Sequence, residues 1–440
     1  MQQLKKFARY AIPSVASMWV FSIYTMVDGI FVARGVNSDA LAAVNISLPF
    51  VNLMFAVGLI IATGTSTIVS ITIGRGEGKR AKEIFSQNIV VACVLGGVFT
   101  ALALIFLNPL LIFLGAAGAT LEYARQYVGT IAWFAIFFIV SYNLEVQVKV
   151  DGAPHISTIG VTSCALMNVV LDYLFVMVFN WGVGGAALAT GIAQATSTLI
   201  FALYFLFRGK KLRLTRFKPN PGIYRRIIPV GLADGITELS NGVIILLFNR
   251  TILALAGEGE VACYTVVSYI NTLVLMTMSG IAQGMQPLTS LHFGMGDKAG
   301  VRRFLKYGIV SAIGLSAVFF AASQLGGAGV ARLFFDASDP LLPYTADALR
   351  LFSVSFLMVG VNVVAAAYFA SIERSKVSLF ISFGRGLALL ALSLLAMSRI
   401  FGMEGVWLAP AVSEGVCLIF SAIMLASVLG KSKGKKTKPL

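Results

Sequence analysis

The chain has 440 residues, of which 58% are hydrophobic and only 12% are charged, and its mean hydropathy is +0.87. A soluble protein of this length needs far more charge to cover its surface, so the composition excludes an ordinary soluble fold. The net charge of +15 does not indicate a nucleic-acid-binding protein, because the Lys and Arg residues lie in short segments between apolar runs.

The apolar runs predict an all-α membrane protein with about twelve transmembrane helices. A helix needs about 20 apolar residues to cross the hydrocarbon core, and each run supplies them. The first run starts near Ala8 and continues past any plausible cleavage site, so we expect it to be a helix of the mature protein. The predicted spans are residues 8–34, 40–73, 86–108, 122–149, 156–179, 184–207, 224–256, 261–293, 304–325, 341–372, 376–400 and 404–429.

Basic residues alternate between the two ends of these spans. They gather before the first span, in the even-numbered loops and in the tail: Lys5, Lys6, Arg9; Arg75, Lys79, Arg80, Lys82; Lys149; Arg208, Lys210, Lys211, Arg213, Arg216, Lys218, Arg225, Arg226; Lys298, Arg302, Arg303, Lys306; Arg374, Lys376; Lys431, Lys433, Lys435, Lys436, Lys438. Positively charged loops stay in the cytoplasm. The alternation therefore predicts an even number of spans in an inner membrane, with both termini cytoplasmic.

The longest polar stretch, RGKKLRLTRFKPNPGIYRR, lies near the middle of the chain. We expect it to connect two lobes of six helices each. The expected division is an N-lobe of residues 1–207, a cytoplasmic linker of 208–223, a C-lobe of 224–430 and a basic tail of 431–440.

The two halves repeat each other. The segment LAAVNISLPFVNLMFAVGLIIATGTSTIVSITIGRGEGKRAKEIF aligns without a gap to VACYTVVSYINTLVLMTMSGIAQGMQPLTSLHFGMGDKAGVRRFL. Gly64 falls on Gly284 and Gly74 on Gly294, and we call this constant difference in residue number the repeat offset. Small residues at such positions also suit helix packing. Because the same offset returns elsewhere in the chain, however, a chance match between the two halves is improbable.

The repeat offset returns late in each half. GVGGAALATGIAQ, from Gly182, aligns to GMEGVWLAPAVSE, from Gly402, and places Gln194 opposite Glu414. Because each half has an even number of spans, both halves enter the membrane in the same orientation. The sequence therefore predicts parallel repeats related by an axis along the membrane normal.

Two aspartates lie inside predicted spans of the first half, where charge is costly and marks candidate functional sites. Asp28 lies in the first span, and Asp172 lies in the fifth, one turn after Asn168 and on the same side. Thr190 follows in the sixth span. Two carboxylates with amide and hydroxyl oxygens suit Na⁺, and crowded carboxylates would equally hold a proton. The alternative, that Asp28 or Asp172 caps a broken helix or pairs with the backbone, is disfavoured because these spans contain no basic partner.

The second half has Glu238, Arg385 and Glu414 inside spans. Arg385 either forms a structural ion pair, with Glu414 or Glu238, or contacts substrate. Gln283 and Gln286 lie beside Pro287, and they either line a cavity or bond carbonyls freed by the proline.

The four cysteines are far apart, and the two histidines are isolated. We therefore expect no disulfide, no metal cluster and no prosthetic cofactor. The sequence contains no nucleophile–base arrangement and no nucleotide-binding loop, so we do not expect an enzyme.

Several segments, in their order and spacing, resemble the multidrug and toxic compound extrusion (MATE) transporters, and are most similar to the bacterial DinF-like branch. These segments are VDGIFVARG, IGRGEGKRA, MNVVLDYLF followed by GVGGAALATGIAQ, and ITELSNGVIILLFN, and the resemblance extends over residues 5–430. It implies two six-helix lobes, alternating access, and export of amphipathic organic cations against Na⁺ or H⁺ entry.

The resemblance also implies roles for single residues. Asp28 would be the first-helix acid of an N-lobe cation site, which Asn168, Asp172 and Thr190 would complete. Glu238 would be the seventh-helix acid of the second lobe. Members with a C-lobe cation site have an aspartate in the tenth helix, and FLMVGVNVVAAAYFAS has none. The departure favours a coupling site in the N-lobe.

We therefore expect a monomeric, secondary-active multidrug exporter, a class associated with antibiotic resistance, in the lipid bilayer. One alternative is a flippase for a lipid-linked precursor, which needs basic residues in its cavity, and only Arg250 and Arg385 qualify. Another is a non-transport membrane protein, in which paired halves have no evident use. The sequence leaves open the substrate and the choice between Na⁺ and H⁺.

Overall fold

The computed structural model describes residues 2–36, 38–336 and 338–430, so the expected basic tail of 431–440 lies outside the described residues. Within these ranges the elements are helices, and no strand occurs. The first group of helices, called the N-lobe below, consists of α1 (Gln2–Gly35), α2 (Ser38–Gly74), α3 (Gly78–Ile105), α4 (Leu107–Phe113), α5 (Gly118–Trp133), α6 (Ala135–Asp151), α7 (Pro154–Asp172), the π-helix η1 (Tyr173–Val178) and α8 (Gly182–Phe207).

The second group, called the C-lobe, follows a short 3₁₀ turn, η2 (Pro221–Ile223). It consists of α9 (Tyr224–Leu255), α10 (Glu258–Gly294), α11 (Lys298–Ala331), α12 (Leu341–Ser353), α13 (Phe356–Ser371), α14 (Ser375–Phe383), the π-helix η3 (Gly384–Ala388) and α15 (Leu389–Gly430).

The helices account for the predicted spans. The described residues contain nine helices that are long and apolar enough to cross a membrane, and up to eleven when each of two bent pairs counts as one span. The span Ser375–Val428 has 54 residues, or roughly 80 Å of helix, which is more than twice the hydrocarbon thickness of about 30 Å. It is broken at Gly402, where φ is 58°, so it contains two crossings. The prediction of an all-α fold with about twelve spans is confirmed.

The two bent spans are at matching places in the repeat. The pair α5 and α6 bends by 53° around Phe134, and the pair α12 and α13 bends by 43° around Val354 and Ser355. Phe134 and Val354 are related by the repeat offset, so the bend belongs to the duplicated scaffold.

The turns α2–α3 and α10–α11 also match. Each has a glycine with a left-handed backbone, Gly76 with φ of 82° and Gly296 with φ of 72°, where a side chain would be strained. In the second turn, Asp297 accepts a hydrogen bond from the Gly300 amide at 2.9 Å and caps α11. That amide and the adjacent His292 hold the pKa of the Asp297 carboxyl below its usual range.

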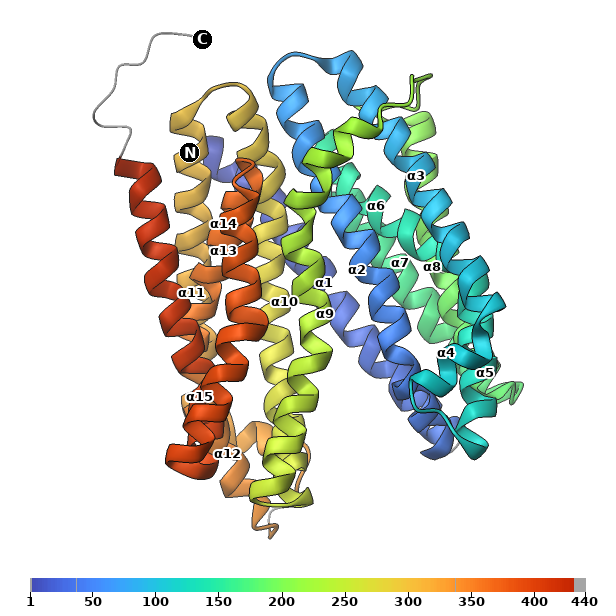
Figure 1. The fold of residues 1–440 in the computed structure, drawn as a ribbon, viewed down its shortest axis with the longest axis vertical. Helices are drawn as coiled ribbons and strands as arrows, with labels where there is room; N and C mark the ends of the chain where they lie inside the picture. The colour runs from blue at the N-terminus through green and yellow to red at the C-terminus, as the bar shows by residue number, and fades with distance from the viewer. Residues whose placement is uncertain (1, 37, 337, 431–440) are drawn as a thin grey trace.

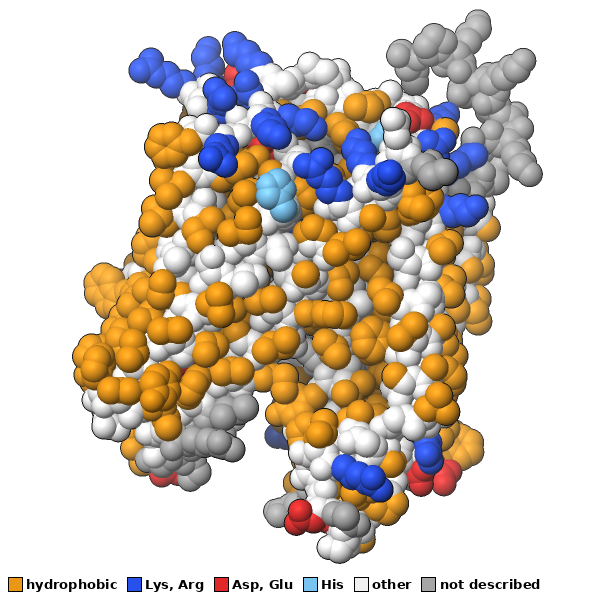
Figure 2. Space-filling model, turned by 180° about the vertical axis from the view of Figure 1, so that it is seen from behind, with side chains coloured by type: hydrophobic (Ala, Val, Ile, Leu, Met, Phe, Trp, Pro, Cys, Tyr) orange, Lys and Arg blue, Asp and Glu red, His pale blue; other side chains and the backbone are white. Residues whose placement is uncertain are grey.

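The lobes meet at one end of the molecule and separate at the other. Figure 1 shows the two helix groups in contact at the end where α1 begins and α15 ends, and diverging toward the opposite end. Figure 2 shows the surface hollowed between the lobes at that opposite end, whereas most Lys and Arg side chains cover the closed end. We call these the open end and the basic end.

Helix α1 connects the two lobes. Figure 1 shows it crossing from the C-lobe side at the basic end to the N-lobe at the open end. Its first turns, with Phe7, Tyr10 and Ala11, belong to the C-lobe hydrophobic core, whereas Val32 belongs to the N-lobe core. A tilt of α1 would therefore change the contact between the lobes.

Glycines let the lobes approach closely at the basic end. A Cβ atom at Gly74 of α2 would lie 2.2 Å from the Leu291 carbonyl oxygen of α10, and one at Gly294 would lie 2.1 Å from the Ile71 carbonyl oxygen. The repeat offset relates both pairs of equivalent residues, Ile71 with Leu291 and Gly74 with Gly294. The two contacts are thus one contact repeated about the axis between the lobes, and only glycine fits them.

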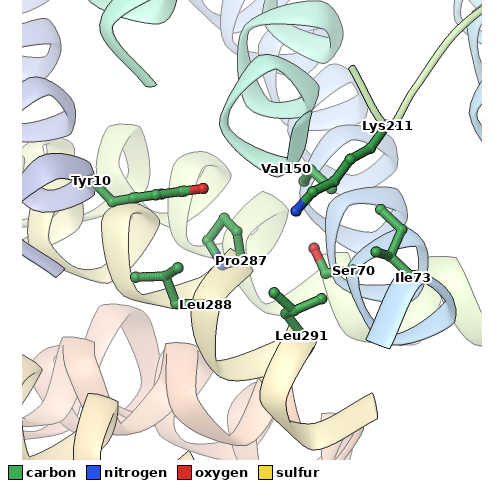
Figure 3. A pocket seen from close by; sticks show the side chains of 8 residues that line it. All are labelled: Tyr10, Ser70, Ile73, Val150, Lys211, Pro287, Leu288 and Leu291. Carbon is green, nitrogen blue, oxygen red and sulfur yellow. The ribbon is translucent and has the colours of Figure 1, made fainter. Parts of the chain in front are cut away.

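The seam between the lobes at this end is nearly filled. A pocket of about 10 Å³, enough for roughly one water molecule, lies within it. Figure 3 shows Lys211 of the linker pointing its amine into this pocket, beside residues of both lobes. Its lining consists of Tyr10, Ser70, Ile73, Val150, Lys211, Pro287, Leu288 and Leu291.

The linker is fixed to the N-lobe. The Asp151 carboxylate at the end of α6 accepts hydrogen bonds from the amides of Lys210, Lys211 and Leu212 at 2.8, 2.6 and 2.7 Å, and from the Tyr204 hydroxyl at 2.6 Å. Gln87 of α3 exchanges two hydrogen bonds with the Asn220 backbone. These contacts attach most of the linker to the N-lobe, which leaves the η2 turn as the joint to the C-lobe.

We expect Gly294→Ala to destabilise the closed seam, because the new methyl group would overlap the Ile71 carbonyl oxygen and force α2 and α10 apart. Overpacking of this kind costs about 1–3 kcal/mol. The melting temperature of the purified protein should fall by several degrees. Gly314→Ala in α11 is the matched control, since a Cβ there meets nothing within 4 Å. Equal melting temperatures for the two variants would contradict a close-packed seam.

Candidate functional site

The four N-lobe residues singled out in the sequence lie on three neighbouring helices. Asp28 is in α1, Asn168 and Asp172 are in α7, and Thr190 is in α8. The carboxyl groups of Asp28 and Asp172 face each other within hydrogen-bonding reach. Asn168 Nδ2 donates to Thr190 Oγ1 at 3.3 Å, and Thr190 Oγ1 donates to the Ala186 carbonyl at 3.0 Å. The fold therefore brings all four side chains into one cluster, called the N-lobe cluster below.

The oxygens of this cluster are buried and lack donors. Asp172 and Asn168 have 0% of their surface exposed. No described residue donates a hydrogen bond to Asp28 Oδ1, to either carboxylate oxygen of Asp172 or to Asn168 Oδ1. Buried oxygens without donors are costly, and two carboxylates that face each other cannot both stay ionised without a positive charge between them. The cluster therefore suits a small cation or a proton.

Asp172 is an exception among the buried charged side chains of the described chain. Asp151 has four donors, as described above, and Glu145 is paired with Lys149. Glu414 is paired with Arg385. Asp172 has no basic partner and no well-formed hydrogen bond in the described residues, with only the Asn168 amide as a donor beside it. Since buried ionic groups are normally compensated, this exception points to a ligand.

Two tyrosines belong to the N-lobe cluster and were missed in the sequence. Tyr127 of α5 lies beside both Asp28 and Asp172, and Tyr24 of α1 lies beside Asp28. Both rings are buried. Tyr24 could have been found, since it is one turn before Asp28. Tyr127 is on a helix whose charged residues, Glu122 and Arg125, pair with each other at the surface and do not point to the cluster.

The backbone changes directly after Asp172. The π-helix η1 runs from Tyr173 to Val178, and π segments inside helices are frequent at functional sites. A Cβ atom at Gly35 of α1 would lie 2.4 Å from Val176 Cγ1, so α1 packs tightly against this segment. The tight packing keeps Asp28 and Asp172 on facing helices.

The C-lobe contains a different polar cluster. Arg385 Nε donates to Glu414 Oε1 at 3.0 Å, with 10% and 8% of the two side chains exposed. Asn362 of α13 donates to Glu414 Oε2 at 2.7 Å. The sequence left open whether Arg385 pairs with Glu414 or Glu238, and the structure pairs it with Glu414.

Glu238 lies elsewhere, on the face of α9 toward the N-lobe. It forms no ion pair within the described ranges, and Tyr142 of α6 lies near it. Asp234, one turn earlier on α9, also lies near Tyr142 and beside Thr63 of α2. Sequence reasoning missed Asp234, although it lies four residues before Glu238 and therefore on the same side of the helix. Together they place two acids between the lobes.

Gln283 and Gln286 connect the lobes. Gln286 Nε2 donates to Thr67 Oγ1 of α2 at 3.0 Å, and Gln283 Oε1 accepts from Lys149 Nζ at 2.9 Å. The sequence left open whether they line a cavity or bond carbonyls freed by Pro287. The structure gives them side-chain partners instead, because they project from the side of α10 that meets α2 and α6.

Lys149 was expected in a cytoplasmic loop, and this expectation was wrong. Helix α6 continues to Asp151, and Lys149 has 1% of its side chain exposed. Its Nζ lies 2.8 Å from Glu145 Oε1, one helical turn earlier. Sorting charges by loop could not reveal this pair, because both residues come at the end of an apolar run.

A MatE protein-family model matches residues 13–174 and 236–395, one match in each lobe. The chain belongs to the MatE family. This confirms the resemblance seen in the sequence and the prediction of a transporter rather than an enzyme. The two matches fall on the two halves of the repeat, so the MatE unit is itself the duplicated element.

Curated MatE relatives match nearly the whole chain. "Multidrug export protein MepA" of Staphylococcus haemolyticus is 24% identical over 427 residues, covering 96% of this chain and 93% of the relative. The protein of the same name from Staphylococcus aureus (strain MRSA252) is 22% identical over 428 residues, with 96% and 93% covered.

Solved structures share the MatE fold. A multidrug resistance MATE family transporter described as outward-facing matches with a TM-score of 0.92 at 24% identity, covering 98% of this chain and 97% of that chain. A MATE structure in a bent conformation matches with a TM-score of 0.90 at 24% identity, with 99% of each chain covered.

We expect Arg385→Leu to destabilise this MatE protein strongly, because it would leave Glu414 ionised and buried without its partner. Breaking a buried pair in this way costs about 3–5 kcal/mol. The double variant Arg385→Leu, Glu414→Leu should recover most of the loss in a thermal unfolding experiment. Arg80→Leu is the control, since Arg80 pairs with Glu77 at the surface and such pairs contribute little.

A melting temperature for Arg385→Leu that equals that of Arg80→Leu would contradict a structural role for the pair. Loss of transport in a stable double variant would instead assign Arg385 to the substrate path.

Proposed function

We propose that this chain is a secondary-active exporter of amphipathic organic cations, driven by inward movement of Na⁺ or H⁺. The observation that carries the proposal is the N-lobe cluster, in which buried oxygens of Asp28, Asn168 and Asp172 have no donor in the described chain. The names of the relatives, which are multidrug export proteins, support the direction and the class of substrate. We further propose that it acts as a monomer in the inner membrane, because one chain supplies both lobes.

The orientation follows from the charges. Positively charged loops are retained in the cytoplasm, so we assign the basic end to that side, with both termini. The open end then faces outward, and the similarity to a structure described as outward-facing supports this assignment. In this state the cluster would be loaded from outside while the cytoplasmic seam is closed.

The N-lobe cluster would couple ion entry to release of substrate. A cation that binds between Asp28 and Asp172 neutralises their mutual repulsion and draws α1 and α7 together. Because α1 crosses between the lobes, this movement changes the contact between them. One inward charge gains about 2.3 kcal/mol per 100 mV, which is more than a tenfold ratio of substrate concentrations.

The substrate would bind between the lobes. Asp234 and Glu238 of α9 place carboxyl groups there, beside the aromatic ring of Tyr142. Carboxylates next to an aromatic ring suit an organic cation with an apolar body. The substrate and the coupling ion would thus use different acids.

The alternative of a lipid-linked precursor flippase is less well supported. Such a protein needs free positive charge in its cavity for a pyrophosphate. Arg385 is neutralised by Glu414, and the exposed Arg250 lines a cavity of about 290 Å³ with Asn249, Leu253 and Val261, toward the outer end of α9. Gradient-driven transport of an anionic lipid, but not of an organic cation, would favour the flippase.

We expect Asp28→Asn and Asp172→Asn each to abolish coupled export, because an amide cannot supply the negative charge that holds the ion. The measurement is extrusion of a fluorescent organic cation by proteoliposomes under an imposed ion gradient. Asp347→Asn is the matched control, since Asp347 lies at the surface of α12 and pairs with Arg350. Full coupled export by both cluster variants would sink this assignment.

We expect either an inward Na⁺ gradient or an inward pH gradient to drive export, since the same carboxyl oxygens accept both ions. Asn168→Leu should separate them. Na⁺ needs several oxygens and would lose the Asn168 ligand, whereas a proton needs only one carboxyl oxygen. Na⁺-driven export should fall about tenfold or more while pH-driven export is kept. Equal loss of both would show that Asn168 serves the carboxyl groups rather than the ion.

A further inference from the structure

A second buried ionic group lies at the closed end, away from the N-lobe cluster. Glu145 and Lys149 are one turn apart on α6, with 5% and 1% of their side chains exposed. Besides Lys149, Glu145 Oε1 accepts a hydrogen bond from Ser157 Oγ of α7 at 2.7 Å. The pair is neutral overall, so it does not need an ion and does not compete with the coupling site.

A residue of the C-lobe also accepts a hydrogen bond from this ion pair. Lys149 Nζ donates to Gln283 Oε1 of α10 at 2.9 Å. The amide of Gln283 also lies 3.4 Å from the Tyr142 hydroxyl and 3.7 Å from Met18 Sδ. The carboxamide of one C-lobe residue is thus held by three N-lobe side chains from α1 and α6. A buried ammonium needs several acceptors, and Gln283 supplies one only while the lobes are closed here.

We propose that Glu145, Lys149 and Gln283 form a latch that holds the cytoplasmic gate shut in the outward-facing state. This rests on the proposed function, which requires the seam at the basic end to open during each cycle. The glycine contacts at Gly74 and Gly294 give the seam its close fit, and the latch gives it a directional polar bond. When the gate opens, Lys149 loses Gln283 and remains paired with Glu145.

The latch is mechanically connected to the coupling site. Helix α7 carries Ser157, which bonds Glu145, and also Asn168, about 17 Å further along the same helix. The next residue after Ser157, Thr158, donates to the Pro13 carbonyl of α1 at 2.9 Å. The helices that hold the coupling ion therefore also contact the latch, so their movement on ion binding acts on it.

The gate can be measured without transport. Spin labels at Lys79→Cys, at the start of α3, and Ala299→Cys, at the start of α11, report the distance between the lobes at the basic end. Both positions are exposed, and the repeat offset relates them, so they lie at equivalent places in the two lobes. The four native cysteines, of which Cys93 is exposed, are first replaced. Distance distributions are recorded by electron paramagnetic resonance in lipid nanodiscs.

We expect Gln283→Leu to lower the ratio of closed to open gate about tenfold, since a hydrogen bond to a charged group contributes at least that factor. Gln324→Leu is the matched control. Gln324 also makes side-chain hydrogen bonds, to the Arg350 carbonyl and to Ser353 Oγ, but within the C-lobe. The Gln324→Leu variant should therefore leave the distance between the two spin labels unchanged.

Gln283→Glu should shift the ratio the other way, because a carboxylate opposite Lys149 strengthens the bond across the seam. If Gln283→Leu and Gln283→Glu shift the ratio of closed to open gate in opposite directions, a general loss of folding cannot be the cause. The latch is overturned if Gln283→Leu has the distribution of Gln324→Leu, or if Leu and Glu open the gate equally. Normal transport by the Asp28 and Asp172 variants would refute the proposed coupling site without affecting this result.

Discussion

Ionised groups are expensive in hydrocarbon, and the described part of this chain compensates nearly all of those that it buries. Glu145 has Lys149 and Ser157, Glu414 has Arg385 and Asn362, and Asp151 has three backbone amides and a hydroxyl. Against this background, the buried Asp172 facing Asp28 without a donor is informative. The same physical rule identifies both the structural pairs and the exception, so the site does not depend on family likeness alone.

The duplication preserves geometry and changes chemistry. The bends at Phe134 and Val354, the left-handed glycines of two turns, and the glycine contacts across the seam all recur at the repeat offset. The polar residues of the N-lobe cluster do not recur. The C-lobe equivalents of Asn168 and Asp172 are Ala388 and Leu392, and Leu392 is 64% exposed, whereas Asp172 is buried. Two matched lobes provide the movement, while only one of them provides the candidate ion site.

The features that could be predicted from the sequence are those that can be read from one helix, or from one pair of aligned segments, without knowing how the helices pack. Span number and the intramembrane acids Asp28 and Asp172 follow from apolar length and from charge within it, and the repeat follows from the alignment of the two halves. Asn168 was added because it lies one turn before Asp172, and Thr190 because its hydroxyl follows in the next span. The sequence did not predict Tyr127 in the N-lobe cluster or the burial of Lys149, because these depend on which helix faces are in contact. The partner of Arg385 stayed open for the same reason. Nothing in the sequence favours Glu414 over Glu238, and only the fold brings Glu414 to Arg385.

The proposed export cycle requires each end of the molecule to open at a moderate free-energy cost, and the contacts across the seam at the basic end suit this requirement. Glycine contacts stabilise it through close packing that is lost abruptly as α2 and α10 separate. The bond from Lys149 to Gln283 adds a charge-assisted hydrogen bond to the one from Gln286 to Thr67, while Glu145 keeps the lysine compensated on both sides of the transition. If the carboxylate were on the C-lobe instead, opening would strand two buried charges and cost far more. Placing the ion pair within one lobe, and only a neutral amide on the other, keeps the seam closed without locking it.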